Sequence, residues 1–231
     1  LVVPEGETMV IIGFSGTGKS VAIKHIVGLL EPDSGEVWVD GQRVDRLSRK
    51  ELYMLRRQIG YVFQFAALFD SMTIDENVAM GLRKQGELTE KEISVRVDEA
   101  LDLVDLPDVR GRMPAELSGG MRKRVGIARA IALRPKYILY DEPTTGLDPV
   151  TSATIDALMV RMREQLGVTG IVITHDMRSA YTVGTRIAML YEGTVRAVGS
   201  VDEIQHSTDP IVRQFIEGRA TLEGTGKLVG T

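Results

Sequence analysis

The chain has 231 residues, of which 43% are hydrophobic and 26% are charged, and its formal net charge at pH 7 is −4. These values are typical of a soluble globular protein with one domain and room for an inserted subdomain, and they give no reason to expect a nucleic-acid partner. Because the chain contains no cysteine, disulfides, thiolate catalysis and cysteine-based zinc sites are excluded.

No signal peptide or membrane span is visible in the sequence. The uncharged stretch at 58–69 is too short to cross a bilayer. The chain begins at Leu1 rather than Met, inside a strand-like region. We therefore expect an N-terminal piece to precede it.

The first chemical feature along the chain is a glycine-rich loop. It follows an apolar run at 8–12 that predicts a buried strand, and it precedes a helical pattern at 20–30. Glycines let the backbone N–H groups approach a polyphosphate, while a lysine neutralises the outer phosphates and a serine offers a hydroxyl to Mg²⁺. A flexible Gly/Ser turn is the alternative, and Gly224-Thr225-Gly226-Lys227 is such a decoy because no Ser or Thr follows its lysine. The loop residues are Gly13, Phe14, Ser15, Gly16, Thr17, Gly18, Lys19 and Ser20.

The rest of the chain alternates strand and helix patterns. Short apolar or alternating runs predict strands at 1–12, broken by a turn at 4–7, and at 36–40, 59–63, 137–140, 170–174 and 186–191. Helical periodicity predicts helices at 20–30, 48–58, 74–83, 90–104, 120–134, 149–166 and 176–184. This alternation favours an α/β fold with a mostly parallel sheet. We expect a core formed by 1–64 and 135–208, a helical insertion at 65–134, and a C-terminal docking helix with a loose tail at 209–231.

Two acidic residues end the predicted strand at 137–140. Asp141 is suited to hold Mg²⁺ through water, and Glu142 is suited to polarise a water for attack on a terminal phosphate. Two solvated turn acids before Pro143 are the alternative. Further upstream, Ser118, Gly119 and Gly120 open a helix, which predicts a second anion-binding helix N-terminus or, more simply, a flexible loop with an N-cap.

Taken in order, these motifs resemble the ATPase subunits of ABC transporters. The resemblance rests on GFSGTGKS at 13–20, Gln64 after a strand, LSGG at 117–120, YILYDEP at 137–143, Gly146-Leu147-Asp148 and Thr174-His175-Asp176. It covers nearly the whole chain and implies a RecA-like P-loop NTPase fold with an inserted α-helical subdomain and a small antiparallel β region on the N-terminal side. It also implies a head-to-tail homodimer in which each phosphate loop faces the partner's LSGG helix.

The resemblance assigns roles residue by residue, with ATP and Mg²⁺ as cofactors. Glu142 would act as the catalytic base, His175 would contact the γ-phosphate, and Gln64 would sense Mg²⁺ and the attacking water. Mg²⁺ would be held by Ser20, Gln64 and Asp141. Nucleotide contacts are implied for the loop 13–20 and for Val21, Ser118, Gly119, Gly120 and Asp148. Without the resemblance, Gln64 is an ordinary strand-end polar residue, Asp148 is an N-cap, and His175 is a partly buried structural histidine.

The sequence departs from the family pattern at a few positions. Met121 stands where the signature usually has Gln, and Val21 stands where Thr often follows the serine, but neither change removes a phosphate ligand. The aromatic residue that stacks on adenine in the family lies upstream of Leu1. Trp38 is a tempting substitute, but we expect it to be strand core.

Several residues outside the motifs suggest partner surfaces. Phe63, Phe65 and Phe69 surround Gln64 and predict either the core of the insertion or, with 66–72, a groove for a cytoplasmic helix of a membrane permease. For two further sets of residues we expect no partner role. A solvated face is expected for Arg122, Lys123, Arg124 and Arg129, and structural or surface positions are expected for His25 and His206.

The C-terminal segment refines the resemblance. Ile211, Val212, Phe215 and Ile216 lie at helical spacing. Together with FQFAALFDSMTIDENV and LSGGMRKRVGIARAIALRP, this segment resembles the ATPases of lipid transporters with MCE-domain partners. The resemblance implies a peripheral ATPase on the cytoplasmic face of the inner membrane that powers a separate lipid permease. Alternatives are an importer ATPase for a small polar solute, a soluble non-transport ABC ATPase, and a non-ABC nucleotide switch.

Overall fold

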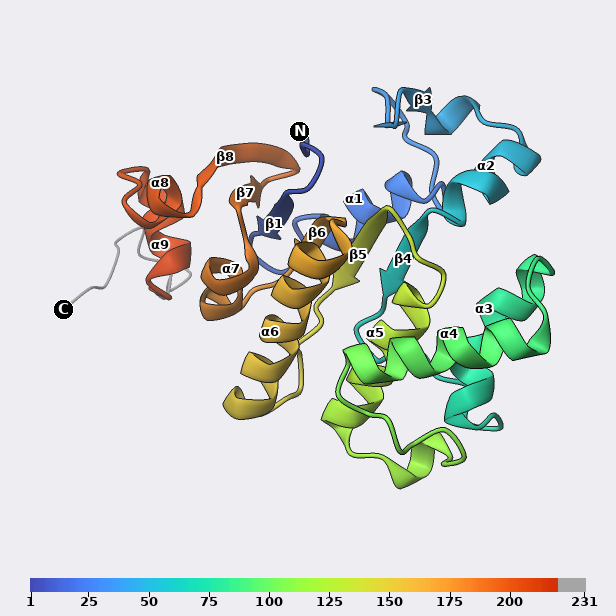
Figure 1. Ribbon diagram of the computed structural model, residues 1–231. Coiled ribbons are helices and arrows are strands. Elements are labelled where there is room, and N and C mark those ends of the chain that lie inside the picture. Colours follow the sequence, from blue (N-terminus) through green and yellow to red (C-terminus); the bar gives the residue numbers. More distant parts are fainter. Residues whose placement is uncertain (220–231) are drawn as a thin grey trace.

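The computed structural model describes residues 1–219 and is built around a six-stranded sheet (Figure 1). Along the sheet, the strands are β4 (Ile59–Val62), β5 (Tyr137–Asp141), β6 (Thr169–Ile173), β1 (Thr8–Ile12), β7 (Arg186–Tyr191) and β8 (Thr194–Ser200). Neighbouring strands are parallel from β4 to β7, and only β8 runs antiparallel to its neighbour. The expected mostly parallel α/β sheet is confirmed.

The central strand β1 shows why the sheet is covered on both faces. All five of its residues are buried. Side chains alternate across a strand, so Val10 and Ile12 enter one apolar cluster while Met9 and Ile11 enter the other. A strand buried on both sides reads as a continuous apolar run, and this is the pattern that its sequence shows.

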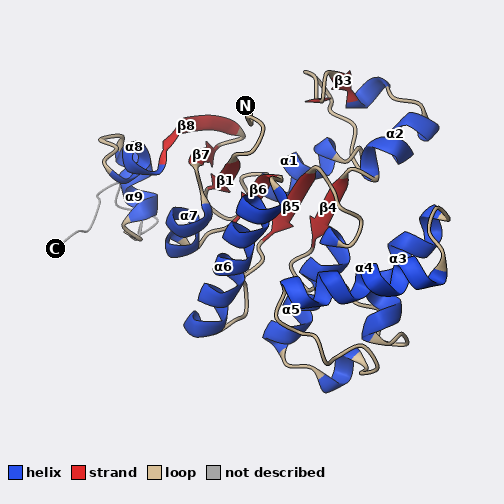
Figure 2. Ribbon diagram, viewed as in Figure 1, coloured by secondary structure: helices blue, strands red, loops and turns tan. Residues whose placement is uncertain are grey.

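Helices cover both faces and both ends of the sheet (Figure 2). Their bounds are α1 Lys19–Ile26, α2 Arg49–Arg56, α3 Ile74–Gln85, α4 Glu90–Leu103, α5 Gly119–Ile131, α6 Pro149–Leu166, α7 Met177–Val183, α8 Val201–Gln205 and α9 Pro210–Ile216. Short 3₁₀ turns lie at Val44–Arg46 and Pro114–Glu116. Within residues 1–219, none of these helices combines the length and the apolar character needed to span a membrane.

Capping chemistry sets where several helices begin. Ser48 and Glu51 form a capping box at the start of α2, and Thr73 and Thr89 cap α3 and α4 in the same way. α5 ends at Ile131, three residues earlier than predicted, because the chain leaves the helix after Ala132 and Arg134 adopts a positive φ of 49°.

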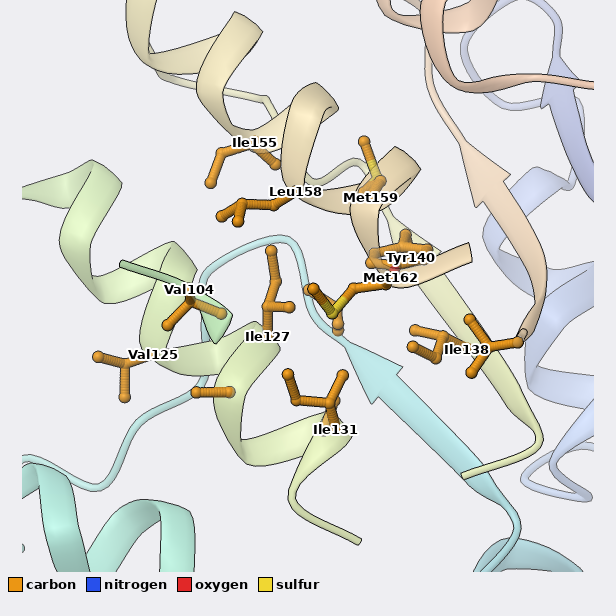
Figure 3. Packing of buried hydrophobic residues seen from close by; sticks show 14 of the residues in the cluster. Val104, Val125, Ile127, Ile131, Ile138, Tyr140, Ile155, Leu158, Met159 and Met162 are labelled. Atoms are coloured by element: carbon orange, nitrogen blue, oxygen red, sulfur yellow. The ribbon is translucent and has the colours of Figure 1, made fainter. Parts of the chain in front are cut away.

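The helices between β4 and β5 share one core with the sheet. Figure 3 shows Ile127 and Ile131 of α5 packed toward Ile155 and Leu158 of α6, with Ile138 of β5 to the right in this view. The same cluster extends to α3, α4 and β1. α5 is therefore the element that joins the helical group to the strands that carry the polar motifs, and the division at 65–134 stays a prediction.

The N-terminal side differs in part from the prediction. The turn expected at 4–7 is present, with the Glu7 N–H donating to the Pro4 carbonyl and Gly6 at a positive φ, but residues 1–3 before it form no strand. β2 (Trp38–Val39) and β3 (Gln42–Arg43) form the small antiparallel sheet that was expected, although the second strand was not predicted. The prediction that Trp38 is strand core is wrong. Trp38 is 57% exposed, because this two-stranded sheet leaves it uncovered, and its indole N–H donates to Glu36.

The C-terminal elements were predicted least well. β8 and α8 were not predicted, although Ser200 and Glu203 form a capping box that marks the start of α8. α9 occupies part of the segment expected to hold a docking helix, and its Val212 is buried in this chain's own core. The predicted loose tail beyond residue 219 and the decoy at 224–227 lie outside the described residues.

One buried carboxyl group lies between α6 and α7. Asp156 is 6% exposed, and its Oδ2 accepts a hydrogen bond of 2.8 Å from the Ser179 hydroxyl, while Oδ1 has no partner in the structure. Burial, with a smaller contribution from Asp176, raises the pKa of Asp156 to about 6. The native state thus holds a proton that the unfolded chain releases above its ordinary value near 3.8.

This shift predicts how an Asp156→Asn variant changes stability with pH. As pH rises from 4 to 7, the wild type loses free energy of unfolding because the buried carboxyl must ionise, whereas the amide does not titrate. Over this pH range the difference in unfolding free energy should move in favour of the variant by about 2 kcal/mol. Urea denaturation at several pH values measures it, and Asp108→Asn reports the effect of removing an exposed charge. A difference that stays constant with pH would contradict the assignment.

Candidate functional site

The glycine-rich loop leaves the carboxyl end of β1 and leads into α1. Gly16 and Gly18 adopt φ values of 80° and 93°, which side-chain-bearing residues rarely adopt. Gly13 is required for a different reason, since a Cβ there would lie 2.3 Å from the carbonyl oxygen of Leu190. The sequence pattern therefore reflects both backbone conformation and close packing.

Lys19 lies at the centre of this loop. Its Nζ donates to the carbonyl oxygens of Gly13 at 2.8 Å and Phe14 at 3.0 Å, and the Thr17 hydroxyl also donates to Phe14. Burial lowers the pKa of Lys19, while the nearby carboxylates of Glu142 and Asp141 raise it. The loop thus curls around an ammonium group that is poised to exchange carbonyl oxygens for those of an anion.

Ser20 and Asp141 meet where β5 ends. The Ser20 hydroxyl donates to Asp141 Oδ1 at 2.8 Å, and Tyr61 of β4 donates to Oδ2 at 3.3 Å. Burial, then the Asp141 charge, raises the pKa of Tyr61 above its usual value, which keeps the phenol protonated as a donor. Sequence reasoning missed Tyr61, although its position in a strand paired with β5 places it near the acidic pair.

The Ser20 and Asp141 oxygens suit Mg²⁺, which commonly takes one or two protein ligands and completes its shell with water and phosphate oxygens. Within residues 1–219, no group of three or more His, Asp or Glu side chains is placed to hold a metal ion by itself. The predicted third ligand, Gln64, follows β4 on the same edge of the sheet.

Glu142 and His175 lie together at the ends of two neighbouring strands. β5 pairs with β6 in parallel, and the Glu142 N–H donates to Ile173 at the end of that ladder. His175 Nδ1 is 2.8 Å from Glu142 Oε2, which also accepts from the Thr145 hydroxyl at 3.2 Å. His175 is exposed, so the alternative of a partly buried structural histidine does not hold.

The basic residues of α5 form the predicted solvated face only in part, since Arg122 is exposed whereas Arg124 and Arg129 are partly buried. Lys123 is 7% exposed, and its Nζ donates to the carbonyl oxygens of Gln64 at 2.5 Å and Glu142 at 3.5 Å. Burial lowers the pKa of Lys123 and the Glu142 charge raises it. The arginines of the set also bind backbone carbonyls, at Leu117 for Arg122, at Val104 and Asp105 for Arg124, and at Ala66 and Ala67 for Arg129. Loop carbonyls without ladder partners require such donors.

The second glycine motif caps α5. Ser118 accepts from the Met121 N–H at 3.3 Å, and Ser118 and Gly119 are exposed. Gly120 is buried, and a Cβ there would lie 2.4 Å from Thr151 Cγ2. Thr151 in turn bonds to Asp148, which caps α6 as expected by accepting from the N–H groups of Val150 and Thr151. Within residues 1–219, no hydrogen bond or ion pair joins residues 118–120 to the phosphate loop.

The phenylalanines around Gln64 are not core. Phe63, Phe65 and Phe69 are 42%, 81% and 47% exposed. The segment that carries them is nevertheless tied down, because the Asn77 side chain accepts from the Phe69 N–H and donates to the Phe69 carbonyl. Between them, Ala66 is buried and Leu68 is partly buried. Separately, Val21 of α1 is exposed. The structure thus presents an ordered aromatic surface beside Gln64.

Because Lys123 donates to the Gln64 carbonyl, we predict that it holds segment 63–69 in place. Lys123→Met should destabilise the fold by about 1–3 kcal/mol, because it leaves the Gln64 carbonyl oxygen without its donor, whereas the Glu142 carbonyl still accepts from the Thr145 N–H. It should also speed chymotrypsin cleavage at the phenylalanines of 63–69. Arg124→Met is the matched control, since Arg124 lies on the same helix but holds the carbonyls of 104 and 105. Equal cleavage of the two variants would argue against this role.

Comparisons with known proteins agree on one family. The family model described as ABC transporter matches residues 1–145. The probable ribonucleotide transport ATP-binding protein mkl of Mycobacterium leprae is 42% identical over 94% of this chain, and the chain spans only 62% of the length of that relative. The intermembrane phospholipid transport system ATP-binding protein MlaF of Escherichia coli K12 is 38% identical over 95% of this chain and 82% of its own length.

A solved structure agrees as well. The dimeric, post-hydrolysis state of the ATP-binding cassette MJ0796 bound to ADP and Pi has a TM-score of 0.79 to this chain. The two sequences are 38% identical, and the match covers 87% of this chain and 88% of that one.

Proposed function

The chain belongs to the ABC transporter family, and we propose that it is an ATPase subunit that dimerises on ATP and drives a separate membrane permease. The observation that carries the proposal is the meeting of three motifs at one edge of the sheet. The phosphate loop follows β1, Asp141 and Glu142 end β5, and His175 follows β6. Each strand is paired in parallel with the next, so their carboxyl ends lie together.

In this proposal, Lys19 and the loop N–H groups bind the β- and γ-phosphates of ATP. Ser20, Asp141 and Gln64 hold Mg²⁺, which would neutralise phosphate charge when bound. Glu142 accepts a proton from the attacking water, and His175, 2.8 Å from its carboxylate, orients Glu142 and reaches the γ-phosphate. Within residues 1–219, His175 is the titratable side chain that hydrogen-bonds to the Glu142 carboxylate.

A dimer would complete the site. Ser118 and Gly119 are exposed at the start of α5, as a helix N-terminus that contacts a second molecule must be. The related cassette MJ0796 is dimeric with ADP and Pi. We infer a head-to-tail arrangement in which Ser118, Gly119 and Gly120 of one subunit cover the γ-phosphate on the loop of the other, with Asp148 at the interface.

For cargo, we infer a lipid, moved by an integral membrane permease that this chain drives from the cytoplasmic face of the membrane, with MCE-domain or other lipid-binding accessory proteins. The support is the 38% identity to MlaF, which is named for phospholipid transport. The relative mkl is named for ribonucleotide transport, and this favours the second candidate, an importer of a small polar solute. Because cargo contacts the permease, the membrane partner decides between the two.

The Glu142→Gln variant tests the catalytic assignment. Gln keeps the size and the hydrogen-bond acceptor but cannot take the proton, so hydrolysis should fall by about a hundredfold or more while ATP binding persists. The variant should accumulate as an ATP-bound dimer, measured by light scattering after size exclusion. Lys19→Ala is the control that should lose both binding and dimerisation. Normal turnover of Glu142→Gln would remove Glu142 as the base.

The exposed phenylalanines predict the permease contact. Phe65→Glu and Phe69→Glu should abolish copurification with the membrane partner, because a carboxylate would have to be buried against the permease helix. Leu68→Glu is less informative, since Leu68 is partly buried in the core. ATP hydrolysis by the isolated subunit should not change, and Val95→Glu, at an exposed apolar position on α4, is the matched control.

Mass spectrometry of the wild-type assembly identifies the permease and any lipid bound to it. Bound phospholipid supports the lipid proposal, and a lipid-free assembly that retains a polar solute supports the second candidate. Unchanged copurification of the phenylalanine variants would place the contact elsewhere.

A further inference from the structure

The phosphate loop contacts β7 and α9 near the end of the described chain. Gly13 is pressed against the backbone of Leu190 in β7. The ring of the next residue, Phe14, lies edge-on to Phe215 of α9, with centroids 5.1 Å apart and planes at 86°, and it also meets Tyr191 at 6.1 Å. Thus α9, far away in sequence, contacts the loop through one aromatic pair.

α9 is held firmly enough to act as a support. Val212 is buried, and Asp209 caps the helix by accepting from the N–H groups of Ile211 and Val212. Arg196 of β8 pairs with Asp209 at 2.8 Å, and Arg213 donates to the carbonyl of Gln205 in α8 at 3.2 Å. α9 is therefore tied to β8 and α8, and β8 pairs with β7, the strand whose Leu190 and Tyr191 contact the loop.

The Phe14 ring is coupled to the chemistry of the loop through its own peptide. The Phe14 carbonyl oxygen accepts from Lys19 Nζ at 3.0 Å and from the Thr17 hydroxyl at 2.9 Å. Ser15 and Gly16, which follow, are exposed. The Phe14 side chain is thus an apolar anchor at the start of a loop whose glycines leave it conformationally free.

We propose that Phe215 is a positioning residue for the phosphate loop, and that α9 thereby sets the affinity for nucleotide without touching it. The proposal rests on the proposed ATP-binding function. A loop already ordered by the Phe14–Phe215 contact loses less conformational entropy when it closes on phosphates. Release of α9 would weaken nucleotide binding while leaving the catalytic carboxylate and its histidine in place.

The test compares nucleotide affinity with turnover in the full chain. Phe215→Ala should raise the Kd for ATP and the KM by about three- to tenfold, the range expected for loss of an edge-to-face pair, with kcat changed by less than about twofold. Ile211→Ala is the matched control, since it also removes apolar packing from α9. It should lower stability to a similar degree but leave the Kd unchanged. Phe215→Tyr, which keeps the ring, should restore affinity.

A double-mutant cycle separates this role from simple packing. If Phe215 acts through Phe14, the Phe14→Ala and Phe215→Ala effects on Kd will not add, and the double variant will bind ATP about as well as the weaker single variant. Additive effects, or a Phe215→Ala variant that binds like the wild type, would overturn the inference and leave the proposed function standing. Failure of the wild type to bind ATP would overturn both.

Discussion

The parallel pairing of β1, β5 and β6 is the constraint on which the rest of the site depends. Each strand ends in a polar motif, and the register that pairs Asp141 with Ile173 brings Glu142 within hydrogen-bond reach of His175. Packing of these strands on both faces fixes that register, because a shift by one residue would exchange the side chains that fit the two apolar clusters. The apolar core therefore sets the geometry of the polar edge.

A second constraint connects that edge to the helical group. Lys123 of α5 is buried and donates to the carbonyls of Gln64 and Glu142, so one ammonium joins the segment after β4 to the segment after β5. The apolar face of α5 packs on α6 and the sheet through Ile127 and Ile131. A displacement of α5 would thus move Gln64 and Glu142 together, which gives the helical group a physical connection to the chemistry in the proposed ATPase.

The sequence was informative where local chemistry determines the structure and weaker where distant contacts do. The phosphate loop, the capping box at Ser48 and the buried strands follow from residue types and spacing. The exposure of Trp38 and the burial of Lys123 do not, because each depends on which elements pack beside the residue. The hydrogen bond from Tyr61 to Asp141 and the ring contact between Phe14 and Phe215 likewise join segments that are brought together only by folding.

The phosphate loop is supported on one side and open on the other. β7 and α9 back it through Leu190, Tyr191 and Phe215, whereas residues 118–120 make no hydrogen bond to it within the described chain. Ser118 and Gly119, which are exposed at the start of α5 in one subunit, can meet the loop of another. If it does so, affinity for ATP is set by two independent supports, one within the subunit and one across the dimer. Only the second can be made and broken in each cycle, because α9 is anchored by its cap and its buried Val212.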